Sequence, residues 1–232
     1  MRLTVHTWGT GERTALLVHG MMADHRTWRR VGPALAERGY RVAAVDLRGH
    51  GTSPRQPGPE GARRYRLDDM AADLADSCPS GAELALGHSL GALVLQRAID
   101  LGLDVGRAVF SDPAWRTQPH DLGPARAYRN ATPAQIRAAN PRWEDAAVAD
   151  ESACLALWDP DTVTALDPPP GLPAAEAVPS LVLLADPSER VPPVQQQALL
   201  TRGFSLRRVT GAGHNIHRDD FPAFMDALAG WV

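Results

Sequence analysis

The sequence of 232 residues contains no lysine, so its 24 basic side chains are all arginine. This absence excludes Schiff-base catalysis, the anchoring of pyridoxal phosphate and the lysine of a phosphate-binding loop. Cysteine is scarce as well, because only Cys78 and Cys154 are present, without metal-ligand spacing. We therefore expect no disulfide and no metal site, and we interpret both thiols as buried or half-buried side chains.

Long apolar runs and an excess of charge are also missing. No stretch is apolar over the length that spans a bilayer, and residues 1–6 lack the apolar core of a secretory signal. The net charge of −3 does not indicate a nucleic-acid or membrane partner. We expect a cytoplasmic protein with one domain, and the sequence does not indicate its oligomeric state.

The most informative stretch is residues 87–91, Gly-His-Ser-Leu-Gly, which has the spacing of a nucleophile on a strained turn between a strand and a helix. Residues 83–86 before it are typical of a short buried strand, and residues 90–101 after it have helical spacing. The flanking glycines let strand and helix approach closely. This context favours Ser89 as a nucleophile over an incidental serine in a glycine-rich turn.

Strand and helix patterns alternate along most of the chain. This alternation predicts an α/β fold with a mostly parallel central sheet that helices cover on both faces. Strands are predicted at residues 3–8, 13–18, 41–45, 83–86, 106–110, 180–185 and 205–209. Helices are predicted at residues 24–38, 67–76, 90–101, 193–202 and 221–231.

Residues 113–178 interrupt the alternation. This stretch is rich in proline, contains three tryptophans and short helical patterns, and shows no strand signal. Its apolar residues are too few for a separate core. We therefore predict an α/β core of residues 1–112 and 179–232, with residues 113–178 as a helical lid over the carboxyl edge of the sheet.

Two loops that follow predicted strands carry polar or glycine-rich motifs. In residues 19–22, His-Gly-Met-Met, the glycine permits a sharp turn that leaves backbone N–H groups pointing into the crevice at the strand ends. These groups could stabilise an oxyanion, or the stretch could be a plain tight turn. In the loop at residues 46–53 we interpret Asp46 and Arg48 as structural residues that tie the loop to its neighbours.

The order of three side chains along the chain fits nucleophilic catalysis. A serine hydroxyl needs a base to take its proton, and an acid must hold that base in one tautomer. Ser89 comes first, a carboxylate follows the strand that ends at Ala185, and His214 follows the last strand. Because all three follow strand ends of a parallel sheet, they can meet at one edge.

Taken together, these motifs resemble the α/β-hydrolase fold family, and the resemblance covers nearly the whole chain. The matching pieces are His19-Gly20, the loop at residues 46–53, the Gly-x-Ser-x-Gly stretch at residues 87–91, and Gly213-His214. By this resemblance Ser89 is the nucleophile and His214 the general base. The resemblance also implies an oxyanion hole formed by the N–H groups of Met21 and Leu90. It implies no metal or organic cofactor.

The acid of the triad departs from the usual family pattern. Relatives commonly have an aspartate where this chain has Ser188. We prefer Asp186, the carboxylate nearest to the strand end, and Glu189 is the next choice. Asp112 is a third candidate, because some members of the fold place the acid after the strand that follows the elbow helix.

Several side chains are candidates for contact with a substrate. His88, inside the elbow, is expected to pack beside the nucleophile, and the tryptophans to serve in packing or recognition. An aromatic-lined pocket would suit an apolar acyl group or a ring-containing substrate. The candidate substrate-binding residues are Trp28, His88, Trp115 and Trp143.

The sequence thus predicts a serine hydrolase that cleaves a small ester, lactone or related carbonyl compound through an acyl-serine intermediate. Serine at position 89, where aspartate would indicate epoxide or halide displacement, argues against both of those reactions. A carbon–carbon bond hydrolase and a cofactor-free perhydrolase are alternatives on the same triad. A receptor that binds a small molecule and retains the fold is an alternative of another class.

Overall fold

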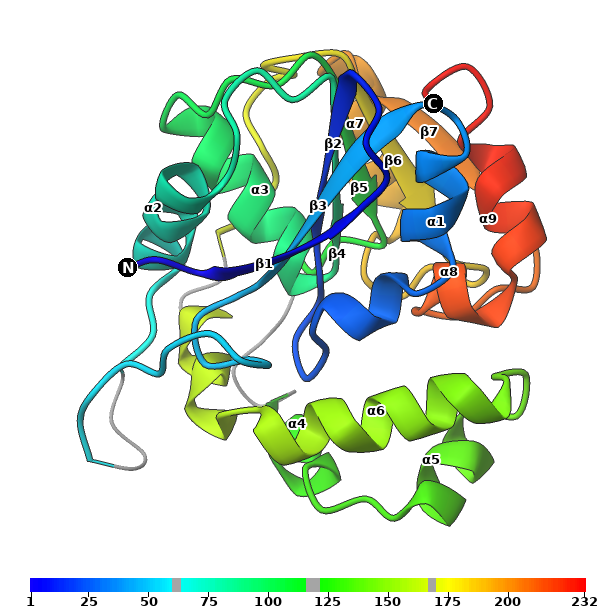
Figure 1. Cartoon of the computed structure of the whole chain (residues 1–232). Coiled ribbons are helices and arrows are strands. Elements are labelled where there is room, and N and C mark those ends of the chain that lie inside the picture. Colours follow the sequence, from blue (N-terminus) through cyan, green and yellow to red (C-terminus); the bar gives the residue numbers. More distant parts are fainter. Residues whose placement is uncertain (60–63, 116–121, 167–169) are drawn as a thin grey trace.

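A computed structural model describes residues 1–59, 64–115, 122–166 and 170–232, whose centre is a seven-stranded sheet (Figure 1). The sheet has the order β1-β3-β2-β4-β5-β6-β7, and only β1 runs antiparallel to its neighbour. The mostly parallel sheet predicted from the sequence is confirmed. Its strands are β1 (Thr4–Trp8), β2 (Arg13–Val18), β3 (Tyr40–Asp46), β4 (Leu84–His88), β5 (Ala108–Ser111), β6 (Ser180–Leu184) and β7 (Ser205–Arg208).

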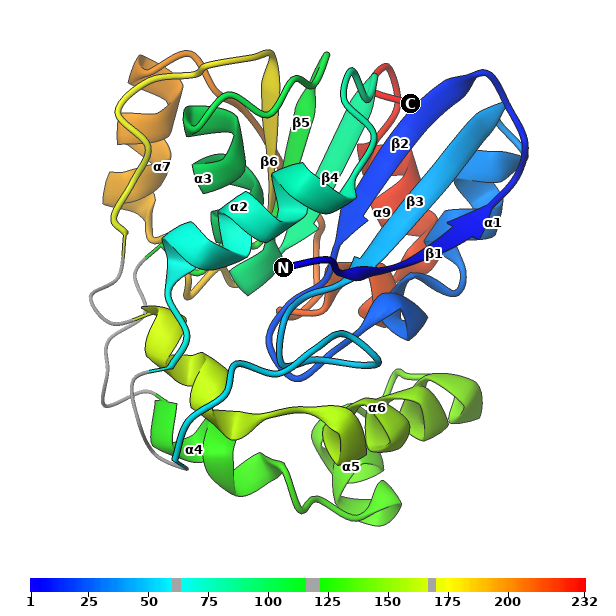
Figure 2. The same ribbon diagram turned by 60° about the vertical axis from the view of Figure 1, so that its left-hand side comes forward.

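Helices cover both faces of this sheet (Figures 1 and 2). One face carries α2 (Leu67–Ser77), α3 (Leu90–Asp100) and α7 (Pro193–Thr201). The other carries η1 (His25–Trp28), α1 (Val31–Ala36), α8 (Ile216–Asp219) and α9 (Phe221–Ala227). Within the described ranges, no helix is both long and apolar enough to cross a membrane.

The structure corrects two predicted helices. The helix expected at residues 24–38 is divided into η1 and α1, and Pro33 in the first turn of α1 gives the physical reason. Proline has no N–H to donate backwards, so it is tolerated at the start of a helix and not in its interior. The last helix, expected at residues 221–231, ends at Ala227.

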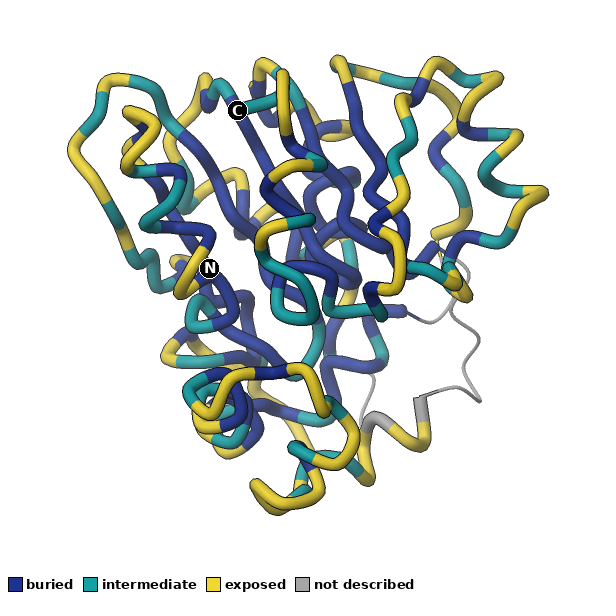
Figure 3. Tube along the Cα trace, turned by 90° about the vertical axis from the view of Figure 1, so that its right-hand side faces the viewer, coloured by how far each residue is buried: buried dark blue, intermediate teal, exposed yellow. Residues whose placement is uncertain are grey.

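Side chains on the two faces of the sheet belong to two separate cores. On β2, Leu16 and Val18 pack into the core under α2 and α3, whereas Ala15 and Leu17 pack into the core under α1 and α9. Figure 3 shows the resulting buried strands at the centre of the molecule. Burial on both faces explains why this strand reads as a continuous apolar run instead of an alternating one.

A group of helices between β5 and β6 lies to one side of the sheet, in both Figure 1 and Figure 2. It comprises α4 (Leu122–Tyr128), α5 (Pro133–Ala139), α6 (Asp145–Leu157) and η3 (Pro160–Leu166), and the described residues in this stretch form no strand. Residues 116–121 and 167–169 of the predicted lid lie outside the described residues. We call this group the lid helices, and their function as a lid remains a prediction.

Glycines let the elbow between β4 and α3 press against the end of β2. A Cβ atom on Gly91 would stand 2.3 Å from the carbonyl oxygens of both Val18 and His19. Those oxygens belong to the backbone of a central strand and the loop after it, so neither can move aside cheaply. The close approach of strand and helix predicted for the elbow therefore depends on Gly91.

We expect Gly91→Ala to destabilise the protein by several kcal/mol or to prevent folding, because the added methyl group overlaps backbone atoms. Gly123→Ala on α4 is the matched control, since a Cβ there meets no atom within 4 Å. Urea unfolding followed by tryptophan fluorescence measures both free energies of unfolding. If Gly91→Ala is as stable as the Gly123→Ala protein, the packing argument is wrong.

Candidate active site

Ser89 stands on the sharp turn between β4 and α3. Its φ of 51° lies in the left-handed region, which a residue with a side chain seldom adopts. The backbone N–H of Ser89 donates to the carbonyl oxygen of Ser111 on the neighbouring strand, at 3.0 Å. This backbone geometry presents the hydroxyl at the end of the strand, as the sequence motif predicts.

His214 lies in the loop between β7 and α8 and contacts the serine directly. Its Nε2 atom is 3.0 Å from Ser89 Oγ, and its Nδ1 atom is 2.6 Å from Asp112 Oδ2. In the neutral imidazole with its hydrogen on Nδ1, this ring donates to the carboxylate and accepts the serine hydroxyl proton at Nε2. The three side chains thus form one continuous hydrogen-bonded chain.

The carboxylate of that chain belongs to Asp112, which follows β5. The buried Asp112 side chain also accepts weak hydrogen bonds of 3.3 Å from the Ala185 N–H and the Ser188 hydroxyl. Its φ of 40° is a second left-handed conformation beside the site. Ser188 occupies the position where an aspartate was expected by resemblance, and here it supports the acid instead of replacing it.

The prediction that Asp186 orients His214 is wrong. The Asp186 carboxylate accepts a hydrogen bond of 3.1 Å from the Gly211 N–H and lies 3.5 Å from Arg208 Nη1. Its side chain is one-third exposed, whereas that of Asp112 is 2% exposed. Glu189 is exposed on the same loop. Of the three candidates, only Asp112 reaches the imidazole.

The loop after β2 lies against the elbow. A Cβ atom on Gly20 would stand 2.8 Å from His88 Nδ1 and 3.2 Å from Ser89 Cβ, so only glycine fits there without a shift of its neighbours. Leu90 is the first residue of α3, where a backbone N–H has no partner within the helix. Neither this N–H nor that of Met21 donates to an acceptor among the described residues. Both amides remain available beside the serine.

A cavity of about 240 Å³ opens onto Ser89 and His214. Its walls come from the elbow, the lid helices and the loops after β2, β5, β6 and β7. The lining residues are Met21, Met22, Ala23, His88, Ser89, Ala114, Tyr128, Ala139, Asn140, Trp143, Glu151, Leu166, Arg190, His214 and Asn215. The serine and histidine therefore face a small, partly open cavity.

Comparison with known proteins gives a match that covers most of the chain. The model of the alpha/beta hydrolase family matches residues 15–227. The chain belongs to the alpha/beta hydrolase family. Among curated proteins, it is 35% identical over 123 residues to "Epoxide hydrolase A" of Mycobacterium tuberculosis, covering 52% of this chain and 37% of that protein.

A second curated relative carries a different name. The chain is 40% identical over 88 residues to "Pimeloyl-[acyl-carrier protein] methyl ester esterase" of Sodalis glossinidius, covering 38% of this chain and 31% of that protein. The matched stretches thus span about a third of the length of these two curated relatives. Their activities do not transfer to this alpha/beta hydrolase without further argument.

Solved structures confirm the fold along almost the full chain. A variant of N-formylmaleamic acid deformylase from Pseudomonas putida S16 aligns with a TM-score of 0.78 at 24% identity, over 97% of this chain and 94% of that one. An esterase from Exiguobacterium antarcticum aligns with a TM-score of 0.78 at 17% identity, over 99% and 94%. At these identities the likeness shows the alpha/beta hydrolase fold alone.

Two of the four residues predicted to contact a substrate line the cavity of this alpha/beta hydrolase, and two do not. His88 and Trp143 line the cavity, and their contact with a substrate stays a prediction. The prediction for Trp28 and Trp115 is wrong, because neither lines it. Trp28, the last residue of η1, is fully buried with its ring centroid 4.6 Å from that of His217, and the ring centroid of Trp115 lies 6.4 Å from that of Phe204.

Some cavity residues have no signal in the sequence. Tyr128, Asn140 and Glu151 come from the lid helices, and Arg190 comes from the loop after β6. Periodicity assigns a helical side chain to a face, but it does not say how one short helix packs on another. A single arginine in a polar loop is likewise indistinguishable from an exposed one.

Buried neutral histidines support the site of this alpha/beta hydrolase. His88 Nε2 donates to the carbonyl oxygen of His214 at 2.9 Å, which confirms that His88 packs beside the nucleophile. The ring of His217 lies 5.0 Å from that of His88, and its Nε2 is 2.7 Å from Thr27 Oγ1. Burial holds the pKa of both histidines well below the ordinary value. Both therefore act as neutral groups.

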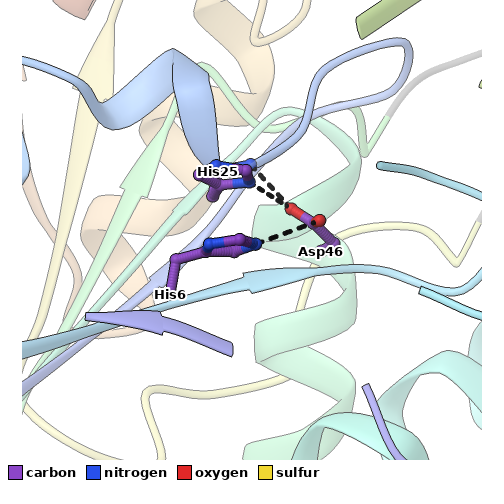
Figure 4. A group of neighbouring side chains, drawn as sticks. All are labelled: His6, His25 and Asp46. Carbon is purple, nitrogen blue, oxygen red and sulfur yellow. Dashed lines mark hydrogen bonds and ion pairs between the residues drawn. The ribbon is translucent and has the colours of Figure 1, made fainter. Parts of the chain in front are cut away.

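A separate cluster of His6, His25 and Asp46 lies next to the loop after β3 (Figure 4). The carboxylate of Asp46 accepts hydrogen bonds of 2.9 Å from His25 Nδ1 and from the backbone N–H groups of His25 and Thr52. These bonds confirm that Asp46 ties the loop after β3 to the loop that carries His25. Arg48 has a similar role, because its Nε donates to Asp73 Oδ2 on α2 at 2.5 Å.

The same cluster has the residue types of a metal site, but its geometry does not suit one. The imidazole rings of His6 and His25 are stacked, with centroids 3.3 Å apart and planes 13° from parallel. The lone pair of an imidazole nitrogen lies in the ring plane, so two stacked rings do not direct their lone pairs at one ion. Hydrogen bonds account for His25 and Asp46, whereas His6 Nε2 lies 3.4 Å from Asp46 Oδ2 and is held by ring stacking on His25.

We predict that the free energy of unfolding decreases as the pH falls below about 6.5. Burial lowers the pKa of His19, His50, His88 and His217 in the folded state, whereas the unfolded chain binds protons near the ordinary value. Each histidine that stays neutral in the folded state then lowers the free energy of unfolding by about 1.4 kcal/mol for every pH unit below that value. Urea unfolding at pH 7.5, 6.5 and 5.5 measures the slope. Equal stability at all three values would contradict the prediction.

Proposed function

We propose that this alpha/beta hydrolase cleaves a small ester, lactone or related carbonyl compound through an acyl-serine intermediate. The observation that supports the proposal is the chain from Ser89 through His214 to Asp112, with contacts of 3.0 and 2.6 Å. This chain ends in a cavity of about 240 Å³ that has room for a small substrate. Serine at position 89 favours acyl transfer over epoxide opening, despite the name of one relative.

In the first half of the reaction, Ser89 Oγ attacks the substrate carbonyl carbon while His214 Nε2 takes the hydroxyl proton. The carbonyl oxygen becomes an oxyanion, which accepts hydrogen bonds from the N–H groups of Met21 and Leu90. Asp112 holds the proton on Nδ1 and stabilises the positive imidazolium. The intermediate collapses with cleavage of the bond to the leaving alcohol, which receives the proton from Nε2.

In the second half, water attacks the acyl-serine carbonyl and His214 Nε2 takes a proton from the water. The oxyanion forms again in the same place, and its collapse breaks the bond to Ser89 Oγ. The serine recovers its proton from Nε2, and a carboxylic acid leaves. Residues of the lid helices line the cavity in which these steps take place, and we propose that they select the acyl group.

Steady-state hydrolysis of p-nitrophenyl acetate and butyrate tests this proposal together with the assignment of the acid. We expect multiple turnovers by the unmodified protein and loss of turnover in Ser89→Ala. Asp112→Asn should lower kcat by about a thousandfold or more, because His214 loses its orientation and its counter-charge. Asp186→Asn is the matched control and should retain kcat within about threefold, since the Asp186 carboxylate lies on Arg208 and Gly211.

Each other outcome has a distinct meaning. A severe loss in Asp186→Asn with an active Asp112→Asn protein would overturn the assignment of the acid. A single acylation event without turnover would favour a receptor that retains the triad. If esters remain intact while a vinylogous diketone is cleaved, or while peroxide is converted to a peracid, the reaction differs but the nucleophile stands.

A further inference from the structure

We infer that Arg190 forms a carboxylate-binding subsite in the active-site cavity, so that the preferred substrate is an ester or related carbonyl compound with a free carboxylate at its other end. The inference rests on the proposed function and names its substrate class. The observation behind it is the balance of charges in the cavity. Arg190 lines the same space as Ser89 and His214.

Arg190 has no hydrogen-bond or ion-pair partner within the ranges that the structure describes, whereas the other charged groups at the cavity are paired. Glu151 Oε2 lies 2.5 Å from Arg218 Nη1, and both side chains are more than nine-tenths buried. Asp112 is engaged by His214 at 2.6 Å. Among the described lining residues, the half-buried Arg190 is therefore the one charged residue without a protein partner, and its positive charge favours an anion in the cavity.

The negative charge nearest to hand in the cavity wall is that of Glu151, and it is already paired with Arg218. The guanidinium of Arg218 lies 4.5 Å from the ring of Trp143, in a cation–π contact that fixes it over a cavity wall. Glu151 thus has a buried partner of its own and is not available to neutralise Arg190. An anionic ligand in the cavity would therefore find the half-buried Arg190 unpaired.

The chemistry of Arg190 favours a carboxylate over a phosphate. A guanidinium presents two parallel N–H groups that match two oxygens of either anion, but only the carboxylate balances its single charge one for one. A phosphate monoester carries nearly two charges, and the described cavity lining offers one unpaired cation. At about 240 Å³, the cavity accommodates a chain of a few atoms between the scissile carbonyl and the carboxylate.

Binding to the Ser89→Ala protein tests the subsite without any need for turnover. The probes are mono-p-nitrophenyl succinate, which is anionic, and its neutral methyl ester, measured by isothermal titration calorimetry. We expect the anionic probe to bind about ten- to a hundredfold more tightly, as a charge-assisted pair does. Adding Arg190→Gln should remove this preference, and Arg190→Lys should retain part of it.

The matched control is Arg41→Gln in the same Ser89→Ala protein. Arg41 is an exposed arginine on β3 that does not line the cavity, so its loss changes the net charge equally and should leave the preference intact. Equal affinity for the two probes, no measurable affinity for either, or a preference that survives Arg190→Gln overturns the inference. So does inorganic phosphate that displaces the probe better than succinate.

The two proposals fail in different ways. If the unmodified protein turns over neutral esters and the Ser89→Ala protein binds both probes equally, the proposed hydrolase activity is supported and the proposed carboxylate subsite is wrong. If the Ser89→Ala protein prefers the anionic probe but the unmodified protein hydrolyses neither probe, the proposed subsite is supported and the proposed hydrolase activity is wrong.

Discussion

The register of β4 against β5 is the constraint on which the rest of the site depends. His88 is paired with Ser111, so the next residues along the two strands, Ser89 and Asp112, leave the sheet side by side. The Ser89 N–H donates to the Ser111 carbonyl oxygen at 3.0 Å and extends this pairing by one residue. Because both strands run in the same direction, nucleophile and acid lie at the same edge, and His214 has only to reach between them.

The residues that pack around Ser89 and His214 at this edge of the sheet are mostly uncharged. His88 packs behind the nucleophile and bonds the backbone of His214, while Gly20 and Gly91 let two loops approach without a side chain between them. The buried histidines carry no charge in the folded state, so His214 has Asp112 as its close counter-charge. The buried Glu151–Arg218 pair at the cavity connects α6 to α8.

Local patterns were sufficient to predict much of this arrangement. The apolar runs of the strands and the glycines of the elbow act through neighbours in the sequence, so the sheet, the strained turn at Ser89 and the position of His214 could be predicted. The acid could not, because Asp112 and Asp186 both follow a strand and only the packing of the loops selects between them. Ser188, which supports Asp112 through its hydroxyl, reads in the sequence as a missing aspartate.

Packing between short segments was the other limit. The sequence left Trp28 and Trp115 as candidates for packing or for substrate recognition, because large aromatic rings serve in both, and here both rings fill cores. Pro33, which prevents one continuous helix over residues 24–38, was visible in the sequence, whereas the helical spacing around it suggested one helix. Tyr128, Asn140 and Arg190 reach the cavity through contacts that no local periodicity encodes.

The most direct test of the central claim, that Ser89 is an activated nucleophile, is the intact mass of the protein after treatment with a broad fluorophosphonate probe. We predict one adduct on the unmodified protein and none on folded Ser89→Ala. The probe reacts with a serine hydroxyl only when a base removes its proton, so the adduct reports the assembled chain from Ser89 to Asp112. No adduct on the folded protein, or an adduct that persists in Ser89→Ala, would contradict the account.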